Sequence, residues 1–225
     1  MNRLSGIVIV LLSAAVVLLG TALLSRQTGA PEAGAPSESR ETATAAPDGS
    51  SGETADLNCM VQSGALQIIR GEAFGISEGA DACEATFADG VYTVTAFGTG
   101  EPVVVTVPQE MTFSRITLSS TGGSLDAEDL DTEELSVSCG QGTLRFSGSV
   151  TSGAEVEHTQ GETSLELDGD PAAFNYDLSY EMGHIQVGEQ SYAGSHGSQS
   201  IDNGSEKTIR VHCSMGSVDI SFSAA

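Results

Sequence analysis

The sequence predicts an all-β domain of the β-solenoid or β-helix-like repeat type, preceded by one transmembrane helix. Two observations lead to this prediction. An uncharged apolar run near the N-terminus is followed by a polar tract, which separates it from the rest of the chain. Over residues 56–225, a pattern of alternating apolar and polar residues centred on a glycine then recurs. An antiparallel β-sandwich is the alternative fold for these residues.

The N-terminal run, Ile7–Leu24, contains eighteen residues without a charge or a proline. As a helix it would be about 27 Å long, close to the thickness of the bilayer hydrocarbon. The apolar core of a cleaved signal peptide is shorter, about 7–15 residues. Residues 1–25 are therefore predicted to be an uncleaved signal-anchor, although cleavage remains open. This predicts a single-pass protein of the cell membrane with its C-terminal domain outside the cell.

Residues 26–55 lack large apolar side chains and are rich in Pro, Gly, Ser, Ala and Glu. Such a composition cannot bury a core, so we expect a disordered stalk that spans roughly 30 Å. The remaining 170 residues, 56–225, suit one domain.

The charge of the chain excludes some partners. All 31 acidic residues and seven of the eight basic residues lie beyond residue 25, so the exported part carries 7 − 31 = −24 formal charges. This surface repels phosphate backbones, and no nucleic-acid partner is expected.

The repeat places apolar residues seven and five positions before a glycine, and two and four positions after it. In one copy, Leu135 and Val137 precede Gly142, and Leu144 and Phe146 follow it. A period of two indicates half-buried strands, and the glycine marks the turn between them. The glycines of the seven copies are Gly64, Gly90, Gly123, Gly142, Gly161, Gly183 and Gly216.

The central glycines are nineteen residues apart, a length that suits one coil of a solenoid. The longer intervals contain additional material, namely a strand at 103–107 and a Ser/Gly/Gln-rich loop at Gly188–Lys207. In the sandwich alternative each glycine closes a hairpin. Asp89-Gly90 and Ser63-Gly64 suit such turns, but Gln141-Gly142 does not.

The copies at Leu135–Gly148 and Ile209–Phe222 resemble the bacterial putative-adhesin family, domains of unknown function built from β-strand repeats. The resemblance covers residues of about 56–225 and is weakest before Gly100. Members of this family often follow an N-terminal membrane segment. The resemblance implies a surface protein and provides no catalytic residues.

Four cysteines lie in this domain, and two of them occupy the same repeat position, three before the glycine. In a stack that follows chain order, Cys139 and Cys213 are three coils apart, about 14 Å. A disulfide requires Cα atoms within about 7 Å, so both are predicted to be buried free thiols. A bond between Cys59 and Cys83 remains open.

No catalytic, cofactor-binding or metal-binding residue is predicted, and no cofactor. The histidines are not spaced as metal ligands, and His158 takes the cysteine position of its copy. The acidic run Asp126–Glu134 lacks the glycine and distal acid of an EF-hand loop. A solvated loop is therefore favoured there over a cation site.

These observations favour a non-catalytic, adhesin-like binding protein of the cell surface, whose partner is an envelope polymer or a membrane protein. A regulatory or structural partner of another membrane protein is the alternative. An enzyme acting on wall polysaccharide is the third hypothesis, disfavoured by scarce basic groups and the absence of Trp. The loop Gly188–Lys207 is either a contact surface or a plain insertion.

Overall fold

The computed structural model describes residues 54–98 and 100–223, which are almost entirely β-structure. No helix in these ranges is long and apolar enough to cross a membrane. The predicted signal-anchor, residues 1–25, lies outside the described residues, as does the predicted stalk up to residue 53. The first strand begins at Ala55.

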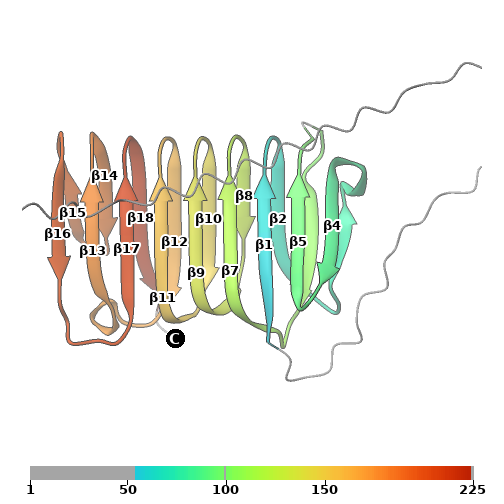
Figure 1. Cartoon of the computed structure of the whole chain (residues 1–225), viewed down its shortest axis with the longest axis horizontal. Coiled ribbons are helices and arrows are strands. Elements are labelled where there is room, and N and C mark those ends of the chain that lie inside the picture. The colour runs from blue at the N-terminus through green and yellow to red at the C-terminus, as the bar shows by residue number, and fades with distance from the viewer. Residues whose placement is uncertain (1–53, 99, 224–225) are drawn as a thin grey trace, which may run out of the picture. The chain divides into compact units, whose positions relative to one another are not determined.

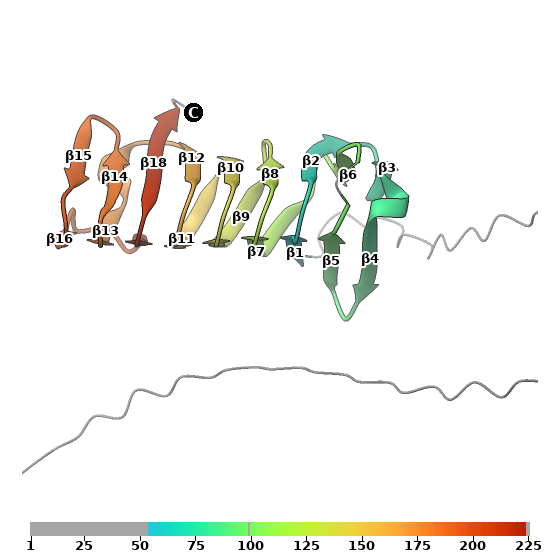
Figure 2. The ribbon, with the colours of Figure 1, turned by 90° about the horizontal axis from the view of Figure 1, so that it is seen from above.

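The described residues form two nine-stranded mixed sheets that lie face to face (Figures 1 and 2). The first sheet has the order β16-β13-β17-β11-β9-β7-β1-β5-β4 and the second the order β15-β14-β18-β12-β10-β8-β2-β6-β3. The first sheet consists of β1 (Ala55–Val61), β4 (Cys83–Ala88), β5 (Val91–Ala96), β7 (Thr112–Ser120), β9 (Asp131–Cys139), β11 (Val150–His158), β13 (Asn175–Tyr180), β16 (Gly197–Ile201) and β17 (Thr208–Cys213). The second consists of β2 (Ala65–Gly71), β3 (Gly75–Glu78), β6 (Val103–Pro108), β8 (Ser124–Ala127), β10 (Thr143–Gly148), β12 (Glu162–Asp168), β14 (Gly183–Val187), β15 (Gln190–Ala193) and β18 (Gly216–Ser223). Two short 3-10 helices, Ala80–Ala82 and Pro171–Ala173, complete the secondary structure.

Most repeat glycines join a strand of the first sheet to a strand of the second. At Gly142, β9 leads into β10, yet β9 pairs in parallel with β7 and β11 and not with β10. The apolar positions of successive copies are in register, as Ile116, Leu135 and Ala154 show. The alternative in which each glycine closes a hairpin is therefore wrong for these copies, including the one at Gly64.

The turn glycines lie directly over one another. Gly142 has φ +114°, and a Cβ built there would lie 2.0 Å from the carbonyl oxygen of Gly123. Gly161 stands in the same relation to Gly142, at 2.1 Å. A side chain would thus collide with the turn below it, which explains why glycine recurs here.

The strands do not stack in chain order, contrary to the assumption behind the predicted cysteine separation. The last pair, β17 and β18, lies between β11/β12 and β13/β14, and the first pair, β1 and β2, lies between β5/β6 and β7/β8 (Figure 1). Cys139 and Cys213 are consequently two strands apart, with β11 between them. They are buried and free, as predicted.

Three regions predicted from the spacing differ in the structure. The copy around Gly90 is a true hairpin, in which β4 pairs antiparallel with β5 and Asp89 and Gly90 both have positive φ. The segment Val103–Pro108 is not extra material, because it pairs with β2 as the neighbour of the repeat strands in the second sheet. The region predicted as a loop, Gly188–Lys207, contains β15 and β16, which add antiparallel to β14 and β13 and end the two sheets.

Candidate functional site: a polar hollow on the first sheet

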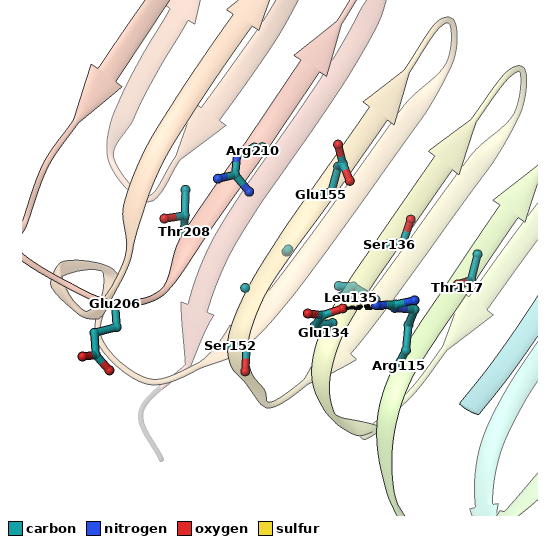
Figure 3. Close-up of a pocket in the computed structure, with 12 residues that line it drawn as sticks. Arg115, Thr117, Glu134, Leu135, Ser136, Ser152, Glu155, Glu206, Thr208 and Arg210 are labelled. Atoms are coloured by element: carbon teal, nitrogen blue, oxygen red, sulfur yellow. Dashed lines mark hydrogen bonds and ion pairs between the residues drawn. The ribbon is translucent and has the colours of Figure 1, made fainter. Parts of the chain in front are cut away.

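A shallow hollow of about 500 Å³ lies on the outward face of the first sheet, over β7, β9, β11 and β17 (Figure 3). Its wall and floor are largely hydroxyl, carboxylate and guanidinium groups. The outward-facing residues that line it are Arg115, Thr117, Glu134, Ser136, Ser152, Gly153, Glu155, Glu206, Thr208 and Arg210.

The hollow exists because β11 presents no side chain at its centre. In one row across the sheet, Glu134 on β9 and Thr208 on β17 flank Gly153 on β11. A Cβ at Gly153 would lie 2.6 Å from the carbonyl oxygen of Thr208, so the close approach of β17 requires glycine. A register shift between Val150 and Gly153 also displaces Ser152 from the ladder.

One wall of the hollow is a satisfied ion pair. Arg115 on β7 donates to Glu134 on β9, with 3.0 Å between Nε and Oε2, and a second guanidinium nitrogen also donates to that oxygen. The hydrogen bond and the negative charge of Glu134 raise the pKa of Arg115. Both side chains are more than half exposed, so the pair shapes the wall and contributes little to stability.

The other polar groups are largely unpaired. The carboxylates of Glu155 and Glu206 make no hydrogen bond or ion pair with any described residue. The guanidinium of Arg210 has only a 4.0 Å contact with Asp177, and its side chain is 63% exposed. Four hydroxyl side chains are likewise without a partner among the described residues, those of Thr117, Ser136, Ser152 and Thr208. The hollow therefore offers both donors and acceptors to a ligand.

Beneath this sheet, a second group of polar residues lies in the core. His158 on β11 aligns with Cys139 on β9 and Cys213 on β17, as its repeat position predicts. Its Nδ1 lies 2.9 Å from the hydroxyl of Thr163, while its Nε2 is buried without a hydrogen-bond partner. Burial lowers the pKa of His158, although the nearby carbonyls of Gly161 and Met215 act in the opposite direction.

The cysteines do not form a reactive site. All four thiols are free, so the Cys59–Cys83 bond that the sequence left open is not made. Burial raises the pKa of each thiol, most strongly at the fully buried Cys59. Protonated thiols are poor nucleophiles and poor metal ligands.

The acidic run Asp126–Glu134 continues from the end of β8 into β9. Asp131 is held by Arg70, 3.0 Å away, and Glu134 by Arg115. Partial burial is the main cause that raises the pKa of Asp126. No group of three His, Cys, Asp or Glu residues within the described ranges is placed to hold a metal ion.

The hollow was not predicted from the sequence, although the sequence pattern does place several of its residues at equivalent positions. Arg115, Glu134, Gly153 and Thr208 all stand eight positions before their repeat glycines, so they form one outward column of the pattern. The order of strands in space could not be inferred, and it is this order that places Thr208 beside Gly153.

Comparison with known proteins gives structural neighbours only. A putative cell adhesion protein from Clostridium sporogenes has 17% sequence identity and a TM-score of 0.47, over 77% of this chain and 94% of that chain. A putative adhesin from Bacteroides fragilis has 9% identity and a TM-score of 0.32, over 75% of this chain and 93% of that chain. No protein-family model and no curated protein matches the sequence. Similarities this low carry no argument about what this protein binds.

Proposed function

We propose that this protein is a membrane-anchored, adhesin-like binding protein of the cell surface, and that the polar hollow is its ligand site. The observation that carries the proposal is the set of unpaired polar groups around Gly153 on the outward face of the first sheet. The family resemblance of Leu135–Gly148 and Ile209–Phe222 supports the same function. An envelope polymer is the partner that such an open, polar surface suits.

We also propose that the N-terminal apolar run is a membrane anchor and that the β-domain is a solenoid. The apolar run Ile7–Leu24 would hold the domain at the membrane, and the tract at 26–55 would hold it away from the bilayer. Strand pairs such as β9 and β10, each divided between the two sheets and stacked in parallel on the next, support a solenoid in which each pair is one coil.

The hollow supports binding better than catalysis. The hollow is open to solvent, so its lining would not exclude water from a reacting bond. Three of the four thiols, those of Cys59, Cys139 and Cys213, lie in the core with raised pKa values, and no cysteine lines the hollow. We therefore propose a non-catalytic role.

A second candidate, binding to another membrane protein, has its own observation. The edge strand β16 carries no charged residue and pairs only with β13 in the described part of the sheet. Such an edge could accept a strand from a partner protein, because its outer backbone groups are free to pair. The insertion at Gly188–Lys207 would then be a contact surface.

The two candidates are separated by retention on cell-envelope fractions. The full-length protein, in a detergent without sugar groups, would be incubated with purified wall polymer and with detergent-extracted membrane proteins. Saturable retention on wall polymer is expected for the proposed function. Retention only on membrane proteins would favour the second candidate, and retention on neither fraction would contradict both.

A further inference from the structure

We infer that the hollow takes a glycan with free amino groups, a polymer of protonated amino sugars. This inference rests on the proposed function and specifies its ligand class. Three properties of the site lead to it, namely the hydroxyl groups, the balance of charge, and the full backbone pairing of the strands beneath.

The hydroxyl groups favour a polyhydroxylated ligand. Ser136 and Thr208 face the hollow from the strands on either side of β11, and Ser152 lies at one end of it (Figure 3). A hydroxyl both donates and accepts, and a sugar ring presents hydroxyls that do the same. The absence of aromatic side chains from the lining fits a ligand held by hydrogen bonds rather than by stacking.

The charge favours a cation among such ligands. Glu155 on β11 is the register partner of Arg210 on β17, but the two form no ion pair, and Glu206 lies farther along the hollow (Figure 3). Neither carboxylate forms an ion pair with any described residue. With Arg115 and Glu134 neutralising each other, only Arg210 opposes these two carboxylates. The exported part also carries 7 − 31 = −24 formal charges, which concentrates cations near its surface and repels anionic polymers.

A cationic peptide suits the site less well. Extended peptides usually bind a sheet by adding a strand, which requires free backbone groups at an edge. The strands under the hollow, β9, β11 and β17, each have a paired neighbour on both sides. Recognition here must therefore proceed through side chains, with sugar hydroxyls as partners for Ser136 and Thr208.

The first test compares three tetrasaccharides that differ in charge. Binding of the full-length protein to oligomers of glucosamine, of N-acetylglucosamine and of galacturonate would be measured by calorimetry at slightly acidic pH, in a detergent without sugar groups. We expect the glucosamine oligomer to bind at least about tenfold more tightly than the other two, because it alone presents ammonium groups to both carboxylates. Equal binding of the acetylated oligomer, or tighter binding of the anionic one, would overturn the inference.

The second test locates the site with charge-neutral variants. Glu155→Gln and Glu206→Gln should each weaken binding of the glucosamine oligomer about tenfold, the loss expected for one charge-assisted hydrogen bond. Glu157→Gln is the matched control, because Glu157 is the next outward residue on β11 and lies outside the hollow. If all three variants weaken binding equally, the effect is one of net charge and the assigned site is wrong.

A third variant fills the hollow without removing a charge. Ser152→Trp should reduce binding at least tenfold by occupying the space above Gly153, while Thr151→Trp, at the adjacent exposed residue that does not line the hollow, should not. Equal loss in both variants would contradict the assignment. If oligolysine displaced the glucosamine oligomer from the protein, the inferred glycan ligand would be wrong and a cationic peptide would be the ligand.

These outcomes are distinct from failure of the proposed function. A protein that is retained on wall polymer, and whose retention is unchanged by Glu155→Gln and Ser152→Trp, still binds the envelope but through another surface. A protein that is retained on no fraction contradicts the binding function itself.

Discussion

The middle of the two sheets and their ends are built differently. From β7 to β12, the turn glycines recur every nineteen residues and lie over one another, so each copy stacks in register on its neighbour. At the ends, antiparallel strands replace the parallel repeat. The repeat alone therefore produces stacked parallel strands, and the stack ends where antiparallel strands cover its last repeat strands.

Each end closes the core with its own side chains. At one end, the rings of Phe74 and Phe87 both pack against Tyr92, with ring centroids 4.0 and 4.3 Å away. At the other end, Tyr192 and Ile201 on the edge strands are only partly buried against the core. Because side chains at an end have a packed neighbour on one side only, the ends should tolerate substitutions that the middle does not.

The largest expected difference concerns the turn glycines. Gly142→Ala should destabilise the protein by about 4 kcal/mol, because it combines left-handed strain with a collision against Gly123. Gly204→Ala, near the end, has φ +72° and no atom within 4 Å of the new Cβ, so it should cost only about 1 kcal/mol. Chemical denaturation measures the free energy of unfolding of both variants. Equal losses would show that the close contact between stacked turns does not require glycine.

Truncation of core side chains should show the same contrast. Leu144→Ala, at a fully buried position of β10, should cost about 3 kcal/mol by leaving a cavity. Ile201→Ala, at a half-buried position of the edge strand β16, should cost about 1 kcal/mol. If thermal unfolding showed that Ile201→Ala lowers stability more than Leu144→Ala does, the packing at the ends would contribute more to stability than the packing in the middle.

The buried histidine should make the middle sensitive to acid. Since burial lowers the pKa of His158, the unfolded chain binds its proton more readily than the folded chain does. The stability due to neutral His158 is therefore complete above its ordinary pKa of about 6.5 and decreases as pH falls below it. In His158→Cys, which copies the residue on the strands at either side, the melting temperature should fall less between pH 8 and pH 5 than in the wild type. Parallel pH profiles for the two proteins would contradict this.

The smallest effect is expected at a turn near the end. Met182 has φ +56° and is 69% exposed, so Met182→Gly should relieve strain while losing little packing. We expect a gain of about 0.5 kcal/mol in the free energy of unfolding. Met215→Gly, at the equivalent turn of β17 and β18 where φ is not positive, should be neutral or destabilising.

Much of the fold could be predicted from the sequence, because the repeat is local. The positions of Leu135, Val137 and their counterparts determine which residues face the core, and the structure confirms this parity. Strand order could not be predicted, because parallel pairing relates residues far apart in the chain and many orders bury the same apolar positions. The edge strands β15 and β16 were missed because polar, glycine-rich sequence is typical of loops. The hollow depends on strand order and was missed for the same reason.

The interior positions of β1 and β17 constrain when the chain can complete its fold. During synthesis β1 emerges first, yet the two strands that flank it, β5 and β7, emerge later. β17 emerges after β11 and β13 and must enter between them, and neither strand has a partner on that side until β17 arrives. A chain stalled before Thr208 would therefore present two facing open edges and an unfilled core. Such an intermediate should be the species most sensitive to proteases and aggregation, so β17 and β18 complete the folding of the two sheets.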